Sequence, residues 1–520
     1  MTMIRTAQTH TGSPLSIPVP SYGDDCVPMR IFLLLMASLI IGCGLGGYEE
    51  ADAACMGSSP TWNATADEPS IQTCMTNATA GDTINVAAGS FTVTTGMTTS
   101  GKGLTITGAG AGSTNITDNG SAGYAFNFSK LSAANFTTIS GFTFIRGATH
   151  AGGMIQLSGG NNEQVSFRFH HNTVSQSVGG RGIFVYGTYG LIDHNTFTVT
   201  DCSSMQSISI QGTSANNDGG HTAWSRALSL GTDKAVYVED NVINRGACLI
   251  NTEDFLDMYS GARLVFRYNI GTNYHIGFHG TDSGGMRSAV SHEVYHNTFT
   301  NTSTTSNQRA ATVRGGTGVW FSNTWNGTPA NPWGAITLMN YRACNGGVYG
   351  WGVCNGTQLK LTAAGLSSNG SRTCSTSGTI GFDSTALDAV PICKNGSGNC
   401  TAFFDGSGTG GYPCRDQVGR APGQALEPLY IWSNTGLASP AIGPYDGGDA
   451  SHCNGFGIAN YILAGRDYVD NGTTPKPGYT AYTYPHPLSN PVTANLPDPG
   501  FLPREGIPVH AARQQYGARQ

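Results

Sequence analysis

An asparagine recurs in one local context along the middle of the chain, and this repeat limits the fold more than any other feature. Each copy is a short apolar stretch ending in the asparagine, as in FRFHHNTV, GLIDHNTF and VYVEDNVI. Successive intervals are 23, 46, 28, 28 and 26 residues, and the interval of 46 equals two of 23. The repeated residues are Asn172, Asn195, Asn241, Asn269, Asn297 and Asn323, with a late copy at Asn434. A repeat of this length predicts structural units that stack.

The residues around each asparagine alternate as they do in a β-strand. The position three before the asparagine is apolar in all seven copies, and the position two before it is mixed. A period of two is that of a half-buried strand. The repeat lacks the leucine spacing and the helical stretch of a leucine-rich repeat, so we expect a stack of strands. Equivalent asparagines on successive turns can then form a hydrogen-bonded ladder.

This repeat resembles the right-handed parallel β-helix superfamily of pectate lyases, polygalacturonases and related surface proteins. The resemblance covers roughly residues 80–345 and again 427–437. It implies an all-β fold, a single-stranded right-handed parallel β-helix with an N-terminal cap and a Cys-rich C-terminal insertion. A β-helix has long lateral grooves that suit linear polymers, but the superfamily carries many activities.

The composition agrees with this fold and excludes some functions. Glycine makes up 73 of 520 residues and only 11% are charged, which suits short strands joined by tight turns. A hydrophobic content of 39% is enough to fill a core. The formal net charge of −6 provides no basic surface, so we expect no nucleic-acid partner.

The N-terminal part is predicted to direct export. The apolar run 31–47 follows Met29, the expected true start, and is too short and too soon followed by polar sequence for a membrane span. Two processing routes stay open: a lipid anchor to the outer membrane on Cys43, or release after Ala53. Residues 1–53 are therefore interpreted as leader and signal peptide, and the mature protein as secreted or attached to the cell surface.

The rest of the chain divides into three predicted parts. Residues 54–345 form the β-helix with its N-terminal cap, 346–426 a disulfide-rich insertion, and 427–520 the last turn and a Pro-rich tail that packs along the outside or caps the end. Export makes disulfides plausible. We expect Cys55 and Cys74 to staple the cap, whereas pairing among the six cysteines from 344 to 414 stays open.

Polar residues gather between residues 248 and 314, and this region is the candidate site. If the 28-residue step between Asn241 and Asn269 holds there, Asn251 lies beside His279 and Asp254 beside Asp282. Two carboxylates would then be about 5 Å apart on neighbouring turns. A like-charge stack is unfavourable unless something neutralises it, which favours a functional role.

The first interpretation of this cluster is the active site of a lyase. Asp254, Asp257 and Asp282 would hold Ca²⁺ through oxygen ligands, and the ion would neutralise a uronate carboxylate. His279 or a basic residue would remove the proton from the adjacent carbon, and Arg287 would hold the sugar acid.

The cluster has two other interpretations, a glycoside hydrolase and a sugar-binding surface without catalysis. In a hydrolase, Asp254 and Asp282 would be the acid and the base. For all readings the expected substrate contacts are Asn251, Arg263, Arg314, Phe321 and Trp432, the last two as outward-facing aromatic residues. Glu239 and Arg267 occupy equivalent positions and are expected to form a surface ion pair.

The sequence thus favours an exported enzyme that degrades a linear, uronate-containing polysaccharide, with a polysaccharide lyase ahead of a glycoside hydrolase. The alternative is a non-enzymatic adhesin or envelope protein that binds glycans. The polar cluster favours the enzyme, whereas the lack of lysine in the cluster and the possible lipid anchor favour the surface protein.

Overall fold

The structure is a computed structural model that describes most of residues 54–490. The gaps within this range are 121, 150–151, 160–162, 201–205, 213–219, 225, 247–253, 281–286, 303–308, 328–334, 340–415, 423–424, 438–439 and 443–461. The predicted signal peptide, the lipid site at Cys43, the Cys-rich insertion, Asn251 and Asp282 lie outside the described residues.

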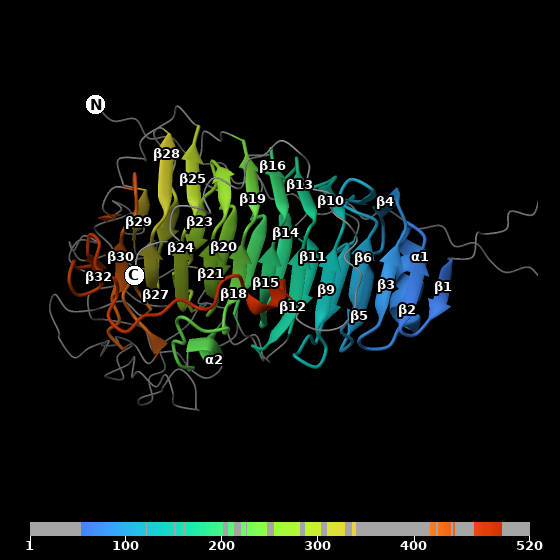
Figure 1. Cartoon of the computed structure of the whole chain (residues 1–520), viewed down its shortest axis with the longest axis horizontal. Helices are drawn as coiled ribbons and strands as arrows, with labels where there is room; N and C mark the ends of the chain where they lie inside the picture. Colours follow the sequence, from blue (N-terminus) through green and yellow to red (C-terminus); the bar gives the residue numbers. More distant parts are fainter. Residues whose placement is uncertain are drawn as a thin grey trace, which may run out of the picture. The chain divides into compact units, whose positions relative to one another are not determined.

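Three parallel sheets run along the molecule, and the chain visits them in turn (Figure 1). Sheet A has 13 strands, sheet B has 9 and sheet C has 10. Of the strand pairs, only β1 with β2 is antiparallel among the described elements. Because each turn of the chain adds one strand to each sheet, the fold is the parallel β-helix that the repeat predicted.

The strands have the following bounds. Sheet A contains β1 Cys55–Ser58, β2 Thr61–Ala64, β3 Thr83–Val86, β6 Thr105–Gly108, β9 Thr137–Ser140, β12 Val165–His170, β15 Tyr189–Asp193, β18 Val236–Glu239, β21 Arg263–Arg267, β24 Ser291–Tyr295, β27 Thr317–Phe321, β30 Leu429–Trp432 and β32 Tyr468–Asp470. Sheet B contains β4 Gly89–Val93, β7 Thr114–Asp118, β10 Thr143–Arg146, β13 Thr173–Gln176, β16 Thr196–Val199, β19 Val242–Arg245, β22 Ile270–Thr272, β25 Thr298–Asn301 and β28 Thr324–Gly327. Sheet C contains β5 Met97–Ser100, β8 Phe126–Ser129, β11 Gly153–Ser158, β14 Arg181–Tyr186, β17 Ile208–Gln211, β20 Leu256–Tyr259, β23 Ile276–Phe278, β26 Ala311–Val313, β29 Ile336–Leu338 and β31 Ala441–Ile442.

Alternate side chains of all three sheets fill the interior. The predicted inward positions, three before each asparagine, are buried, among them Phe169, Phe266 and Trp320 at 0% exposure. Phenylalanines of neighbouring turns pack edge to face, with the Phe144 ring centroid 6.0 Å from that of Phe126. The apolar face of each turn is buried only when the next turn packs on it, so the core forms by stacking of the turns.

The predicted asparagine ladder exists and forms the turn from sheet A to sheet B. The side-chain amide of Asn241 donates to Oδ1 of Asn269 at 3.0 Å, and Asn269 donates to Asn297 at 3.1 Å. The same oxygens accept the backbone N–H groups of the preceding asparagines. The residue before each asparagine has a left-handed conformation, with φ of 54° at His194 and 55° at Asp240. These buried bonds fix the register of sheets A and B.

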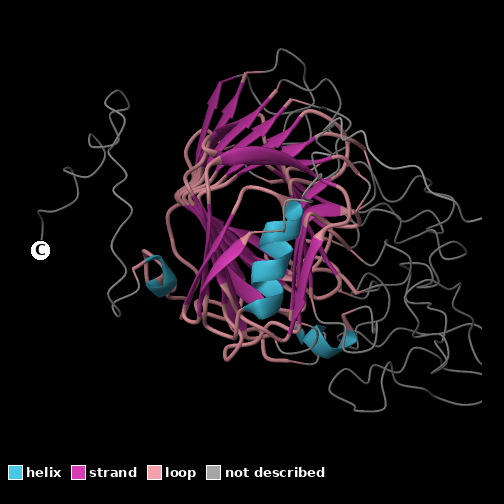
Figure 2. Cartoon of the chain, turned by 90° about the vertical axis from the view of Figure 1, so that its right-hand side faces the viewer, coloured by secondary structure: helices cyan, strands magenta, loops and turns pink. Residues whose placement is uncertain are grey.

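The N-terminal end is covered by a helix, α1 Glu68–Asn77, which lies across the open end of the coil (Figure 2). Asp67 is the N-cap and accepts the N–H of Ser70 at 2.8 Å. The expected disulfide between Cys55 and Cys74 is present and ties the first strand to this helix. A cap of this kind shields the first strand edge from further pairing.

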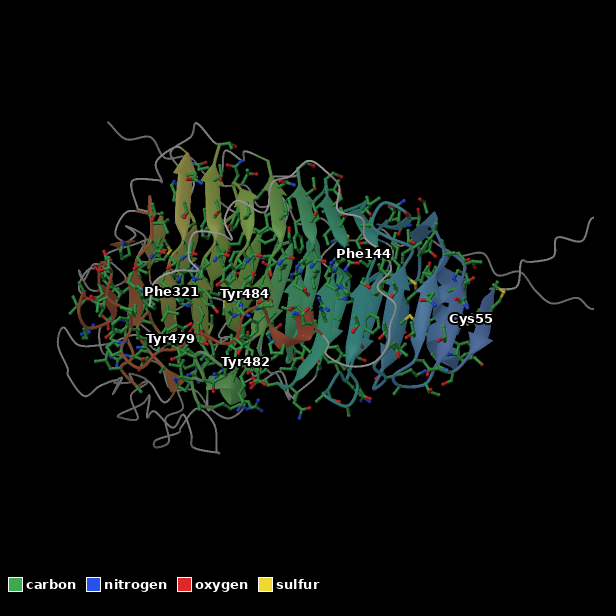
Figure 3. All side chains as sticks on the ribbon, viewed as in Figure 1. Cys55, Phe144, Phe321, Tyr479, Tyr482 and Tyr484 are labelled. Carbon is green, nitrogen blue, oxygen red and sulfur yellow. A yellow bond between two sulfur atoms is a disulfide. The ribbon has the colours of Figure 1, made fainter. Side chains whose placement is uncertain are left out.

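Residues 478–490, which we call the C-terminal strap, pack on the outer face of sheet A (Figure 3). The strap ends in the 3₁₀ helix Pro487–Ser489. Two expectations are corrected by it. Trp432 is only 6% exposed because it stacks on Phe321 at 4.5 Å and meets Tyr479, and Phe321 is partly buried, so the two rings do not form the exposed sugar platform that was expected.

The ion pair between Glu239 and Arg267 also lies under the strap and is not on the surface. Both side chains are 0% exposed, and Nε of Arg267 donates to Glu239 at 2.6 Å. The same guanidinium donates to the carbonyl oxygens of Tyr482 and Thr483 at 2.8 and 2.9 Å. A buried charge needs such partners, which the sequence could not show because they come from over 200 residues away.

Glu293 makes stability under the strap depend on pH. Its carboxylate accepts from Tyr479 and from the N–H of Gly231, and burial raises its pKa from 4.5 to about 7. The fold therefore favours the protonated form, so this contribution is full below about pH 4.5 and is lost as the pH rises through 7. We expect Glu293→Gln to exceed wild type in free energy of unfolding by about 3 kcal/mol at pH 8, with little difference at pH 4. Urea unfolding at both pH values checks this, and a difference that does not change with pH would contradict it.

No helix among the residues that the structure describes is long and apolar enough to cross a membrane.

Candidate active site

A cluster of acidic and basic side chains lies on the outer face of sheet C. Its core comes from β20 and β23, which are paired with Leu256 opposite Ile276 and Asp257 opposite Gly277. The alternation that sends Leu256 and Ile276 inward leaves Asp257 on the outer face. Asp254, just before β20, and His275, just before β23, join the same cluster.

The register in sheet C corrects the predicted stacking. Glu239 pairs with Arg267 in sheet A, a step of 28 residues, but Asp257 pairs with Gly277, a step of 20. The chain advances 14 residues from Val242 to Leu256 but only 6 between their partners, Ile270 and Ile276, and this difference of eight accounts for the change. The 28-residue step, on which the predicted pairings of Asp254 with Asp282 and of Asn251 with His279 rested, does not hold between β20 and β23; Asn251 and Asp282 themselves lie outside the described residues.

His279 lies against Asp257 instead. Its Nε2 is 2.9 Å from Oδ2 of Asp257, and Gln206 donates to the same oxygen at 3.2 Å. The carboxylate is almost fully buried, with 2% of its side chain exposed, whereas 21% of the imidazole is exposed. Tyr259 is beside the imidazole, with ring centroids 5.8 Å apart. A buried carboxylate thus holds a histidine that substrate can reach.

A second acid–histidine pair lies next to the first. Nδ1 of His275 is paired with Oδ1 of Asp254, and Nε2 is 2.9 Å from the hydroxyl of Thr312. Burial lowers the pKa of His275 although Asp254 opposes this, so we assign a neutral ring. The neutral ring can accept from Thr312 through Nε2, while Nδ1 lies against Asp254 without a well-aligned hydrogen bond.

Gly277 is what allows both carboxylates to meet. A Cβ at this position would be 1.9 Å from Oδ2 of Asp254 and 3.0 Å from Oδ1 of Asp257. Any side chain would therefore displace Asp254. The carboxylate of Asp254 occupies the space left by the glycine, next to the carboxylate of Asp257.

The environments of the two carboxylates shift their pKa values in opposite directions. Burial would raise the pKa of Asp254, but His275, Arg314 and His279 together hold it below its usual range. Burial raises the pKa of Asp257, and His279 offsets this only in part. Opposite shifts in one pair of acids are typical of sites that use one group as acid and another as base.

Two arginines add positive charge to the cluster. Arg314, one residue after β26, lowers the pKa of both carboxylates through its charge. Burial lowers the pKa of Arg309, and the charge of Asp254 opposes this. Arg314 is thus at the site as predicted, though by a different register, since β23 and β26 pair with a step of 35 residues.

Two other predicted site residues are structural. Arg287 is 0% exposed, makes a bidentate pair with Asp416 at 2.6 and 2.7 Å, and lies over the ring of Trp224. Arg263 is 2% exposed and donates to the carbonyl oxygens of Ala227 and Leu228. A segment containing the short helix α2 His221–Trp224 covers both, so neither is available to substrate.

The sequence reasoning missed His275, Tyr259, Gln206 and Arg309. All four are polar residues at or near the ends of strands of sheet C, where no asparagine marks the register. The motif YHIGFHG held the signal, because two histidines four residues apart, around a strand of three, both project outward.

The donor set tests the expected Ca²⁺ site. Asp254, Asp257 and His279 offer ligand atoms within 4.8 Å of one another, and Oδ1 of Asp257 is buried with no hydrogen-bond partner among the described residues. Ca²⁺ takes six to eight oxygen ligands. Here each carboxylate already binds a histidine, and two arginines act on them. The described residues alone therefore do not fit calcium, and the third predicted ligand, Asp282, lies outside them.

Comparison with known proteins gives structural similarity without sequence similarity. The sequence matches no protein-family model and no curated protein. The catalytic domain of a GH87 α-1,3-glucanase in complex with nigerose is 15% identical over 52% of this chain and 48% of that chain, with a TM-score of 0.32. This chain thus spans about half the length of that glucanase domain.

Two alginate lyases are similar in the same way. The lyase from Paenibacillus sp. is 17% identical over 52% of this chain and 96% of that chain, with a TM-score of 0.28. A PL6 family alginate lyase is 14% identical over 54% of this chain and 47% of that chain, with a TM-score of 0.25. The fold assignment rests on the three parallel sheets themselves: the chain is a parallel β-helix.

Proposed function

We propose that this protein cleaves a linear, uronate-containing polysaccharide by β-elimination at the cluster on sheet C. The observation that carries the proposal is the pair of Asp257 and His279, a buried carboxylate behind a partly exposed imidazole. Tyr259 and Arg314 next to this pair supply the other groups that the reaction needs.

β-Elimination removes the proton on the carbon next to the uronate carboxylate and expels the glycosidic oxygen. His279 acts as the base in this proposal. Its Nε2–H is held by Asp257, which leaves Nδ1 as the nitrogen that takes the proton. The carboxylate behind the ring stabilises the imidazolium that forms, as in other acid–histidine pairs.

Arg314 and Tyr259 complete the reaction. A guanidinium neutralises the uronate carboxylate and makes the neighbouring C–H more acidic. Burial raises the pKa of Tyr259, although Arg181 and Ser209 oppose this, so the phenol keeps its proton at neutral pH. The phenol can then donate that proton to the leaving oxygen.

Hydrolysis is the second candidate, and one observation favours it. The pKa of Asp257 is raised and that of Asp254 is lowered, which suits a proton donor and an ionised partner. Their oxygens lie within 4.8 Å, which is closer than the spacing of an inverting pair of acids. A hydrolase of this kind would retain the anomeric configuration.

We also propose that the enzyme works outside the cytoplasm, since the predicted signal peptide precedes the β-helix. Whether the chain is released after Ala53 or anchored by a lipid on Cys43 stays a prediction. Polysaccharides are the partners that suit this location.

A product screen tests the proposal. The chain from residue 54 is incubated with pectate, alginate, glycosaminoglycans and neutral glycans, with EDTA or with Ca²⁺. We expect ultraviolet absorbance from unsaturated sugars on one uronate polymer, and no loss in EDTA because Arg314 supplies the positive charge. Loss of activity in EDTA, restored by Ca²⁺, would establish a calcium site completed by residues such as Asp282.

The other outcomes of this screen are equally decisive. Reducing ends without absorbance would establish the hydrolase and exclude β-elimination. Retention of a polymer without any product would favour the adhesin or envelope protein. Asp257→Asn tests the carboxylate behind His279, because it keeps the size of the buried side chain and removes its charge, and we expect it to lower the rate.

A further inference from the structure

A cavity of about 620 Å³ lies away from sheet C, at the turn between sheets A and B. Its lining comes from the turn residues of successive coils and from the C-terminal strap, including Asp240, Val242, Ile270 and Tyr484. This volume is within the range of small-ligand pockets. Nothing in the proposed reaction uses the cavity, so the inference drawn from it does not depend on that function.

One row of outward-facing residues in sheet B changes from threonine to apolar side chains next to this cavity. The row consists of the first residues of the paired strands β10, β13, β16, β19, β22, β25 and β28. Five of these are threonine, and only Val242 and Ile270 are apolar. Threonine satisfies the strand geometry at this row, so the fold does not need the two apolar side chains.

Those two side chains are exposed. Val242 is 46% exposed, Ile270 is 59% exposed, and Tyr484 of the strap is 38% exposed. Only five large apolar side chains are this exposed among the residues that the structure describes, and three of them line this one cavity. Apolar surface gathered in a concave place marks a binding site.

Polar groups border the apolar floor. The carboxylate of Asp240 accepts from the hydroxyl of Tyr484 at 2.8 Å, and the rings of His171 and His194 stack in parallel 5.1 Å apart. Tyr484 also stacks on Tyr268, with centroids 3.6 Å apart. The site therefore has a rigid aromatic wall with carboxylate and imidazole groups along its edge.

The charges in the lining argue against an acidic ligand. The guanidinium of Arg168 is engaged in two bonds to the buried carboxylate of Asp193, at 2.9 and 2.8 Å. Asp193 also raises the pKa of His194, whose Nδ1 is 2.8 Å from the same carboxylate, so both cationic groups of the lining are directed toward Asp193. The remaining carboxylate of Asp240 would repel a uronate. A pyranose without charge has an apolar C–H face and a rim of hydroxyl groups, which match the apolar floor and the polar border.

We propose that this cavity binds a neutral glycan, at a site separate from the cleavage site. The apolar pair Val242 and Ile270 with Tyr484 receives the face of a sugar ring, and Asp240 and His194 bind its hydroxyl groups. The protein would hold one polymer at the strap while sheet C acts on another.

Affinity gel electrophoresis of the native chain tests this. The gels contain laminarin, hydroxyethyl cellulose or glucomannan as neutral probes, and alginate as the acidic probe. We expect retardation in at least one neutral gel, and a Kd roughly tenfold weaker for Val242→Thr with Ile270→Thr. This double variant continues the threonine row, so the fold is expected to stay intact. Leu426→Thr is the matched control, because it removes an apolar side chain with 48% exposure outside the cavity.

Three results would overturn the proposal. One is the absence of retardation in all neutral gels, and another is equal retardation of the double variant and the wild type. The third is a dimer in sedimentation velocity that the double variant dissociates, since the apolar pair would then be a contact between copies. Cleavage on sheet C is measured in parallel, and we expect it to be the same in all three proteins.

Discussion

His279→Ala is expected to lower kcat/KM for polymer cleavage by roughly 10² to 10⁴-fold, the usual contribution of a general base. The reason is geometric: His279 is the partly exposed partner of a buried carboxylate, and no other histidine in the described residues pairs with Asp257. Initial rates of ultraviolet absorbance on the best uronate polymer measure the effect. Circular dichroism should show the same β-sheet content, because the ring lies outside the core.

Two further variants test whether the loss of rate is specific to His279 and which reaction type it serves. His296→Ala removes a histidine at the turn from sheet A to sheet B and should leave the rate unchanged, since this residue does not belong to sheet C. Asp254→Asn distinguishes the reaction types, because a hydrolase needs this carboxylate ionised and would lose about as much rate as His279→Ala. Full activity of His279→Ala would remove His279 from the mechanism and with it the proposed elimination.

The asparagine repeat made the fold predictable because it reports a physical contact on every turn. Each amide must bond to the next one, so its spacing gives the register of sheets A and B directly. The inward positions follow from the same frame, and Phe169 and Trp320 are buried as predicted. Such local and repeated constraints are visible in a sequence without any alignment.

The site was less predictable because sheet C lies beyond loops of unequal length. The eight extra residues before β20 move Asp257 opposite Gly277, and no repeated residue reveals this shift. The structure does bring four residues of the predicted region together, namely Asp254, Asp257, His279 and Arg314. The partners of each residue, however, depended on a register that the sequence did not show.

Covering segments explain the remaining errors. Arg263, Arg287, Phe321 and Trp432 stand on outward positions, where a solitary coil would expose them. The chain then returns to cover them: Tyr479 over the aromatic residues and Asp416 over Arg287. The contact between Arg287 and Asp416 spans 129 residues, and the Cys-rich stretch falls between them. Contacts this distant leave no periodic signal.

Substitution of Arg287 therefore tests whether this residue stabilises the fold, as its contacts indicate, or binds the sugar acid, as the sequence predicted. Arg287→Met is expected to lower the free energy of unfolding by about 3–5 kcal/mol, because it removes the guanidinium that pairs with the carboxylate of Asp416, which is buried at 0% exposure. Adding Asp416→Asn should recover much of this loss. The amide removes the buried charge, can still accept the N–H of Ser288, and tolerates the left-handed backbone at φ 56°. Urea unfolding of the wild type, the single variant and the double variant measures the cycle.

The activity of the same proteins decides what Arg287 does. Since its guanidinium is occupied by Asp416 and covered by Trp224, the folded fraction of the double variant should cleave at the wild-type rate. A variant that is as stable as the wild type but inactive would show instead that Arg287 reaches the substrate. That result would restore the sugar-acid contact that its position in the sequence suggested, and would place the reacting polymer beyond sheet C, over the segment that contains α2.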